Sequence, residues 1–334
     1  MTTARPKNNR QAARWLEQKV TPTMRTIISN TLGIAVAIAF LPQVVAGPLD
    51  ELQVSSDTKW LVHLDFDSFR GTQVGDFVND SLLGPHRDKI REDFKRDFDF
   101  DLDWDKIKSI TAFGSDYKID SDQAGLMLIR TDPQLQKDFH TLLESKVDAG
   151  FGPLKIQAIK SEIEHLYSLA GELYVAVEPD GLFLLGKSRK QIETAKTALK
   201  TSHTPLSKVE AFSEYPSLPN TMIFLAVADA FGEFADIPPQ ARVLQMSKGG
   251  RLALCETDEN ILLQLELKTK DKKTSRQIHS VVQGMLTLAM LSSGDERLTE
   301  LAEAINVSSG EAVVTLKLEL PIERALGTLK RFTK

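Results

Sequence analysis

The sequence predicts an α+β fold made of two similar units of antiparallel sheet covered by helices. Two observations lead to this prediction. Short apolar strands follow one another as hairpins, and the same order of elements occurs twice along the chain. The strand, helix, strand alternation of a doubly wound parallel sheet is missing. With 334 residues the chain can bury a sizeable core, and we expect the helices on one face of the sheet.

The first unit spans residues 59–200 and opens with a strand. In KWLVHLDFDSF, from Lys59 to Phe69, apolar and polar residues alternate, which is typical of a half-buried strand. Near the end of the unit, Ser188 and Gln191 have the spacing of a capping box and predict the start of a helix. Between these elements we expect a helical region at 70–96, strands at 107–113 and 124–129, a helix at 133–147, and strands at 155–159, 165–169, 173–177 and 182–185.

The second unit spans residues 221–334 and repeats this plan. MIFLAVADAF, from Met222 to Phe231, aligns with WLVHLDFDSF, from Trp60 to Phe69, and both runs end in Asp-x-Phe. Residues 201–220 contain three prolines and are expected to link the units. The repeated order indicates an internal duplication. The other expected elements are strands at 251–255 and 261–267, helices at 272–291 and 296–305, a strand at 312–320 and a helix after Pro321.

The segment ahead of both units resembles an export signal. Leu32 to Leu41, LGIAVAIAFL, is an uncharged apolar run of signal-peptide length, well short of the ~20 apolar residues of a membrane-spanning helix. Val44 and Ala46 are the small residues that a signal peptidase accepts, so cleavage is expected after Ala46. We therefore expect an exported protein, periplasmic or extracellular, with residues 1–46 as basic leader and signal peptide and residues 47–58 as a linker.

Two alternatives stay open at this end of the chain. Met24 could be the true start, which would make residues 1–23 an upstream extension. Residues 26–46 could also remain uncleaved and anchor the protein in a single pass, although Asn30 and Pro42 interrupt that window. Contact with a membrane is expected only in this second case.

The charge of the exported part restricts its partners. The whole chain has a formal net charge of −5, and residues 1–46 carry six Lys/Arg and one Glu, a net +5. The part after Ala46 therefore carries −10. An acidic protein without a basic stripe lacks the surface that attracts nucleic acid, so we expect no nucleic-acid partner.

Five aspartates alternate with four large apolar residues in DFDFDLDWD. Counted from any of the first three aspartates, the sixth position is not Gly and the twelfth is not Glu, so an EF-hand calcium loop is excluded. We expect an extended edge segment whose Phe and Trp side chains pack inward and whose carboxylates discourage edge pairing. A weak, exposed cation site is the alternative. The carboxylates are Asp97, Asp99, Asp101, Asp103 and Asp105.

His63, Asp65 and Asp67 share one face of the first predicted strand. Three such side chains could act as metal ligands, but same-face residues lie roughly 6.5 to 7 Å apart along a strand and would converge poorly on one ion. A solvated or helix-covered polar face is the stronger expectation. In the second unit Leu225 stands in the place of His63.

GLFLLGKS, from Gly181 to Ser188, matches the phosphate-loop pattern G-x-x-x-x-G-K-[ST]. The four residues between the glycines are bulky strand formers. In an extended strand they span roughly 13 Å and cannot curl around a phosphate. The sequence therefore predicts a strand at this position, and we expect neither a nucleotide ligand nor any other cofactor.

No catalytic residue is predicted. The chain contains no G-x-S-x-G pattern, and its histidines are scattered without an acidic neighbour that suggests a triad. The only cysteine, Cys255, lies in the strand-like run RLALC and is expected to be a small buried hydrophobe. The helix at 278–291 is apolar almost all round, which is typical of a central buried helix, although its two methionines could line a groove for lipid or peptide.

Four stretches resemble exported bacterial proteins of unknown function that contain a duplicated α/β unit. They are WLVHLDFDSF, FDFDLDWDKIKSITAFG, GLFLLGKS ahead of a helix, and the closing AVVTLKLELP. The resemblance is one of pattern and assigns no functional residue. We expect a non-catalytic binding or interaction protein of the cell envelope, with an envelope protein as partner. A carrier of an apolar ligand or lipid is the alternative, and an envelope hydrolase whose site assembles only in space is the second alternative.

Overall fold

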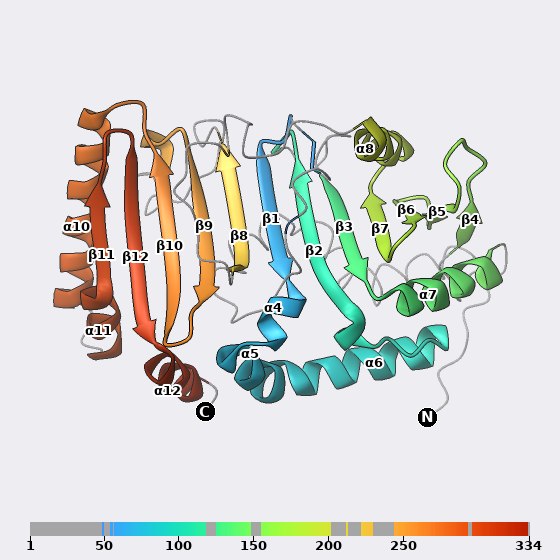
Figure 1. Cartoon of the computed structure of the whole chain (residues 1–334), viewed down its shortest axis with the longest axis horizontal. Helices are drawn as coiled ribbons and strands as arrows, with labels where there is room; N and C mark the ends of the chain where they lie inside the picture. Colours follow the sequence, from blue (N-terminus) through green and yellow to red (C-terminus); the bar gives the residue numbers. More distant parts are fainter. Residues whose placement is uncertain are drawn as a thin grey trace, which may run out of the picture.

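The computed structural model describes residues 49, 54–55, 57–117, 125–147, 155–201, 212, 222–229, 244–292 and 296–332. Within them, one twelve-stranded antiparallel sheet has the strand order β11-β12-β10-β9-β8-β1-β2-β3-β7-β6-β5-β4 (Figure 1). The fold is therefore α+β with a large antiparallel sheet, as predicted. The predicted signal segment, Met24 to Ala46, lies outside the described residues.

The bounds of the elements follow the predictions closely. The strands are β1 (Trp60–Asp65), β2 (Ile107–Gly114), β3 (Leu126–Thr131), β4 (Ile156–Ala158), β5 (Leu166–Leu169), β6 (Leu173–Glu178), β7 (Leu182–Gly186), β8 (Met222–Asp229), β9 (Gly249–Glu256), β10 (Asn260–Lys268), β11 (Ile305–Ser309) and β12 (Val313–Pro321). The helices are α4 (Phe66–Arg70), α5 (Gln73–Val78), the π-helix η3 (Asn79–Leu83), α6 (Gly84–Phe98), the 3-10 helix η4 (Trp104–Lys106), α7 (Pro133–Lys146), α8 (Arg189–Thr201), α10 (Lys272–Ser292), α11 (Glu296–Ala304) and α12 (Ile322–Phe332).

The two halves of the chain meet where β1 pairs with β8, in the middle of the sheet (Figure 1). His63 of β1 lies opposite Leu225 of β8. At one end of the pair, the N–H of Asp229 donates to the carbonyl of Lys59 at 2.8 Å, and the hydroxyl of Tyr117 contacts the carbonyl oxygens of both residues. From this seam, β2, β3 and β7 extend the sheet on one side and β9, β10 and β12 on the other.

Helices cover both faces of the sheet, so the prediction of one covered face is wrong for α8. Along β6, Val175 and Val177 pack with Leu143 of α7, whereas Ala176 between them packs with Ile192 of α8. Neighbouring residues of a strand point to opposite faces, so α7 and α8 lie on opposite sides. The physical reason is that β7 buries consecutive residues and needs apolar cover on both faces.

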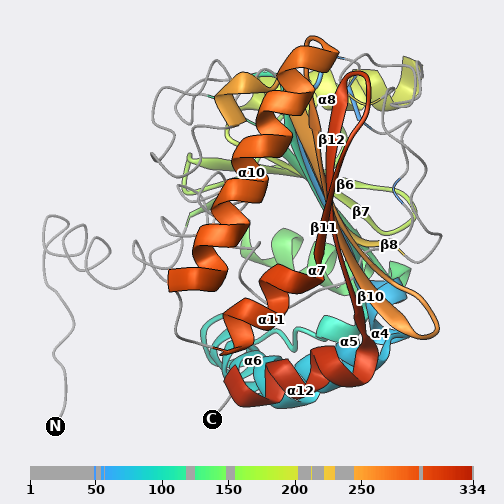
Figure 2. The same ribbon diagram turned by 90° about the vertical axis from the view of Figure 1, so that its left-hand side faces the viewer.

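Helices from both halves pack together across one end of the strands. α4, α5, α6 and α12 lie there (Figures 1 and 2). Ile322 of α12 is buried with Val74 and Val78 of α5. The carboxylate of Glu256, on β9, accepts hydrogen bonds from the N–H groups of Gln73 and Val74 at 2.9 and 3.3 Å. It thereby satisfies donors in the first turn of α5 that have no partner within the helix.

Local side-chain hydrogen bonds and one glycine turn set the ends of α7, β7 and α8, and the capping box of Ser188 and Gln191 forms as predicted. The Asp132 side chain accepts a hydrogen bond from the Gln134 N–H at 2.8 Å and caps α7. Ser188 and Gln191 bond each other reciprocally at the start of α8, at 3.0 and 3.3 Å. Gly181, in the turn before β7, has φ +81°, and a Cβ there would lie 2.1 Å from the carbonyl oxygen of Thr131. The turn therefore requires glycine.

Two elements differ from the prediction. β1 ends at Asp65 rather than Phe69, because the Asp65 side chain accepts a hydrogen bond from the Ser68 N–H at 2.7 Å and starts α4. β11 was not predicted. Its sequence, INVSS, is short and mostly polar, and Val307 is its buried residue. The alternation of apolar and polar residues that predicts a half-buried strand is therefore missing.

A buried ion pair bridges β9 and β10. Arg251 and Glu266 lie opposite each other in register, with Arg251 Nε 2.6 Å from Glu266 Oε2. Glu266 is 0% exposed, and among the described residues its second oxygen, Oε1, has no hydrogen-bond partner. The carboxylate therefore depends on Arg251 for compensation of its charge.

We predict that Arg251→Met lowers the free energy of unfolding by about 3 to 5 kcal/mol, because it leaves a buried carboxylate without its cation. The double variant Arg251→Met/Glu266→Leu should recover most of that loss, since it removes both charges. Urea denaturation of the two variants and the parent measures the difference. Equal losses in the single and double variants would contradict this interpretation.

Candidate functional site

The aspartate-rich stretch, residues 97–105, does not form an extended edge strand. It contains the end of α6 and the segment that runs back along that helix. α6 continues through Phe98, and Asp99 has a left-handed φ of 52°. The chain then runs back along α6, whose cations pair with the carboxylates. The pairs are Arg87–Asp105 at 3.3 Å, Arg91–Asp101 at 2.5 Å and Lys95–Asp99 at 3.8 Å.

The remaining members of the stretch also have structural roles. Asp103 caps η4 by accepting a hydrogen bond from the Asp105 N–H at 3.1 Å. The side chain of Asp97 lies outside the described part of the chain. As predicted, the apolar residues point inward: Phe100, Leu102 and Trp104 pack with residues of α7. Four of the five carboxylates are therefore used in pairing or capping.

His63, Asp65 and Asp67 do not converge. His63 is 1% exposed, and its Nδ1 lies 2.7 Å from the hydroxyl of Thr111 on β2. Asp65 caps α4, and its burial raises the pKa of its carboxyl, while hydrogen bonds from Ser68 act in the opposite direction. Asp67 pairs with Arg70 at 2.6 Å. His63, Asp65 and Asp67 therefore each have a separate structural partner.

The phosphate-loop match and the cysteine have the predicted structures. Leu182 to Gly186 form β7, which pairs with β3 and β6. Cys255 is fully buried, and burial raises the pKa of its thiol to about 11. A thiol with this pKa is protonated at neutral pH and is a poor nucleophile.

α10 lies beside the sheet at its β11 edge (Figures 1 and 2). It exposes an apolar stripe. Its inner face packs Ile278 and Val282 against β10 and β12. Its outer face carries four exposed apolar residues at intervals of three and four. These residues, called the α10 stripe below, are Val281, Met285, Leu288 and Leu291, which are 44%, 44%, 65% and 80% exposed.

The prediction of a central buried helix at 278–291 is therefore wrong. α10 is apolar on two sides. Only one of these sides contacts the sheet, because α10 lies at the outer end of the sheet. A sequence that is apolar all round does not distinguish a helix enclosed by protein from one with an exposed binding face.

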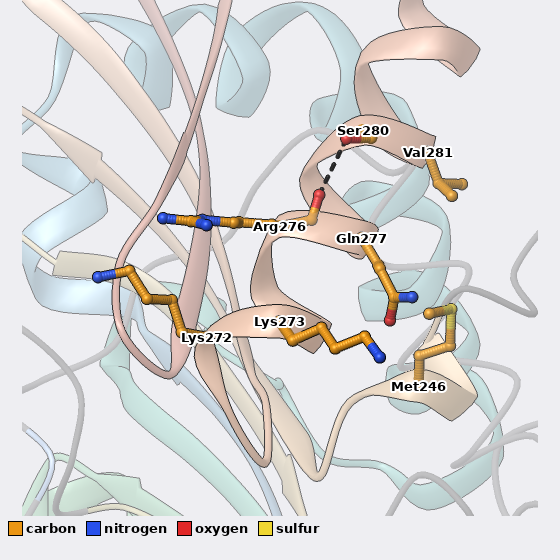
Figure 3. A pocket seen from close by; sticks show the side chains of 7 residues that line it. All are labelled: Met246, Lys272, Lys273, Arg276, Gln277, Ser280 and Val281. Atoms are coloured by element: carbon orange, nitrogen blue, oxygen red, sulfur yellow. Dashed lines mark hydrogen bonds between the residues drawn. The ribbon is translucent and has the colours of Figure 1, made fainter.

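A basic hollow of about 760 Å³ adjoins the start of the α10 stripe (Figure 3). Three cations from the first turns of α10 line it, together with Met246 and Val281. Lys272 also pairs with Glu311. The complete lining is Met246, Lys272, Lys273, Arg276, Gln277, Ser280 and Val281. An apolar stripe with basic residues at one end suits an anionic, amphipathic surface.

A group of titratable side chains lies near the opposite end of the sheet. His140 and Glu144 are one turn apart on α7, and His165 is in the turn before β5, with φ +54°. One ligand atom from each of these three residues lies within 4.8 Å of the others. His140 Nε2 is 2.8 Å from the Tyr167 hydroxyl and 3.6 Å from Glu144 Oε1. These four residues are called the His140 cluster below.

Burial and charge act on the His140 cluster together. The pKa of His140 is lowered, mainly by burial and also by His165, while Glu144 acts in the opposite direction. Burial raises the pKa of Tyr167 to about 12, so its hydroxyl stays protonated. The imidazole rings of His140 and His165 meet edge to face, with centroids 4.3 Å apart. Neutral imidazole is the form that coordinates metal ions.

The sequence prediction missed the His140 cluster. The only signal was the spacing of His140 and Glu144, which places both on one face of a predicted helix. His165 comes from a different element, and its approach to α7 depends on the pairing of β5 with β6. No spacing in the sequence indicates that approach.

None of the described helices is both long enough and apolar enough to cross a membrane. The alternative anchor at residues 26–46 lies outside the described part of the chain.

We predict that Arg91→Gln raises the pKa of Asp101 toward 3.8, because the Arg91 guanidinium holds that pKa down through a hydrogen bond and its charge. A depressed pKa in the folded state means that the pair favours folding above about pH 3.8 and loses this effect as the pH falls. A carboxyl-carbon NMR titration measures the shift. Arg96→Gln, whose guanidinium pairs with Asp93, is the control. An unchanged Asp101 pKa in Arg91→Gln would contradict the pairing.

The chain matches no protein-family model and no curated protein. Among solved structures it is similar to three crystal forms of TP0453. Form III has a TM-score of 0.44 and 10% identity and covers 85% of this chain and 98% of that chain. Form I has a TM-score of 0.43 and 10% identity, and the match covers 87% of this chain and 100% of that chain. Form IV has a TM-score of 0.45 and 11% identity, and the match covers 85% of this chain and 96% of that chain. Values this low carry no conclusion about function.

Proposed function

We propose that this chain is a non-catalytic exported protein of the bacterial cell envelope that binds a protein partner through the α10 stripe. The observation that carries the proposal is the exposure of Val281, Met285 and Leu291 on a helix whose other side is packed in the core. A contiguous exposed apolar patch is costly in water and is typical of an interaction surface. Burying such side chains at an interface is a main source of binding energy.

Charge suggests the chemistry of the partner. The part of the chain after Ala46 has a net charge of −10, yet Lys273 and Arg276 line the hollow at the start of α10 together with Lys272, which is paired with Glu311. A partner segment with an apolar face and acidic residues at one end would complement both features. An amphipathic acidic helix of another envelope protein fits this description.

The carrier of an apolar ligand is the second proposal. Its motivation is the hollow beside Met246 and Val281, which is large enough for part of a lipid. The cations in the lining favour an anionic ligand over a purely apolar one. Ile278 and Met285 are two helical turns apart on nearly the same side of α10, but Ile278 is buried against the sheet whereas Met285 is 44% exposed, so the two do not line one enclosed apolar space. The protein partner is therefore the better supported of the two.

An envelope hydrolase has weaker support. The His140 cluster gathers two histidines and a carboxylate, but Glu144 and His165 are exposed to water. Catalytic electrostatics depends on groups held in a site from which water is excluded.

We also propose that the sheet arose by duplication of one unit. The aligned residues His63 and Leu225 lie opposite each other in the β1–β8 pair. Each arm then adds three strands in the same order: β2, β3 and β7 in one arm, β9, β10 and β12 in the other. A hairpin followed by a helix ends each half, β6–β7–α8 and β11–β12–α12. A local twofold axis through the seam would relate the halves.

Crosslinking from the α10 stripe tests the partner. A photoreactive amino acid at Met285 should crosslink an envelope protein, and Met285→Glu combined with Leu291→Glu should abolish pull-down of that protein, because both substitutions place charge in an apolar interface. The matched control is Gln283→Glu, also exposed on α10 but outside the stripe. Native mass spectrometry that finds bound lipid and no protein adduct at Met285 would instead support the carrier.

Sequencing the N-terminus of the mature protein tests export. Cleavage after Ala46 predicts Gly47 as the first residue, because Val44 and Ala46 fit the signal peptidase. Recovery of an intact apolar segment in the membrane fraction would contradict cleavage and support the anchor.

A further inference from the structure

We propose that His140, Glu144 and His165 form a binding site for a divalent transition metal ion with zinc-like ligand preference. The site is separate from the α10 stripe and does not depend on the function proposed for it. Its ligands come from α7 and from the turn before β5, so a bound ion would tie the helix to the end of the sheet.

The geometry places the three ligand atoms close to coordination distance. They lie within 4.8 Å of one another. Around a tetrahedral zinc with bonds of about 2.0 to 2.2 Å, ligand atoms are roughly 3.3 to 3.6 Å apart. His140 Nε2 and Glu144 Oε1 are already 3.6 Å apart. His165 therefore has to close the remaining gap, which its exposed side chain can do by a change of rotamer.

Tyr167 fixes the orientation of His140. It is 3% exposed on β5, and its ring contacts His140 edge to face, with centroids 5.9 Å apart. Its hydroxyl lies 2.8 Å from Nε2, the atom that would bind the ion. Tyr167 is thus a positioning residue through its ring contact. An ion bound at Nε2 takes the place of the Tyr167 hydrogen bond, so metal binding and this hydrogen bond exclude each other.

The alternative is a purely structural role, in which the cluster packs the imidazoles of His140 and His165 against Tyr167 and binds no metal ion. The backbone of His165 does not distinguish the two explanations, because its φ of +54° lies in the left-handed region, which histidine enters more readily than most non-glycine residues. An exposed imidazole at this position adds little core packing. Coordination gives a reason for an imidazole beside His140 and a carboxylate.

The donor set decides the class of ion. Two imidazole nitrogens and one carboxylate oxygen suit Zn²⁺, Ni²⁺ and Cu²⁺, whereas Mg²⁺ and Ca²⁺ prefer oxygen ligands throughout. Three protein ligands leave the fourth tetrahedral position for water or for a group from a partner.

Isothermal titration of the full chain with ZnCl₂ and with MgCl₂ tests the site. We expect one Zn²⁺ per chain at micromolar or tighter affinity and no measurable Mg²⁺ binding. His165→Asn removes one ligand but tolerates the left-handed backbone, and Glu144→Gln removes the carboxylate without changing its shape. Each should weaken Zn²⁺ binding by more than about tenfold. The matched control is His86→Gln, because His86 is an exposed histidine of α6 outside the cluster. This variant should bind Zn²⁺ with the affinity of the parent.

A thermal melt supplies an independent readout. Zn²⁺ should raise the Tm of the parent and of His86→Gln, because an ion that binds only the folded state stabilises it. The rise should be absent in His165→Asn. Equal Zn²⁺ affinity in the parent and in His165→Asn, or no Zn²⁺ binding to the parent at micromolar concentration, would overturn the proposal and leave the packing explanation.

Discussion

The pairing of β1 with β8 is the constraint on which the rest of the structure depends. Every other strand reaches the middle of the sheet only through one of these two. The pairing is reinforced at the Lys59 and Asp229 carbonyls by Tyr117, and at the far end by α12 packed on α5. Without this seam, β1 and β8 would each become an exposed apolar edge, which is prone to aggregation.

The seam also determines where the candidate surfaces lie. α7 and α10 follow β3 and β10, the corresponding strands of the two arms, and both pack on the same face of the sheet. α7 carries His140, which is half-buried against Tyr167, and the exposed Glu144, whereas the outward side of α10 carries the α10 stripe. Under the proposed duplication these are equivalent helices that have acquired different surfaces, one suited to a metal ion and one to a partner.

Much of the fold could be predicted from local chemistry. The reciprocal bonds of Ser188 and Gln191, the Asp132 cap and the turn at Gly181 each involve residues close in sequence, so their spacing alone predicts them. The features that the sequence did not predict have a different origin. The two covered faces of β7 and the approach of His165 to α7 depend on pairing between distant strands. The local pattern of α10 is compatible with either a buried or a peripheral helix, and its position at the end of the sheet decides which.

Native-state hydrogen exchange along β1 and β8 tests the central claim, that the two halves form one cooperative sheet joined at this seam. In a single cooperative sheet, the slowest amides of both strands exchange only through global unfolding, with the same free energy of opening as the amides of β2 and β9. Amides of β1 and β8 that open together at a much lower free energy, while β2 and β9 stay protected, would contradict it.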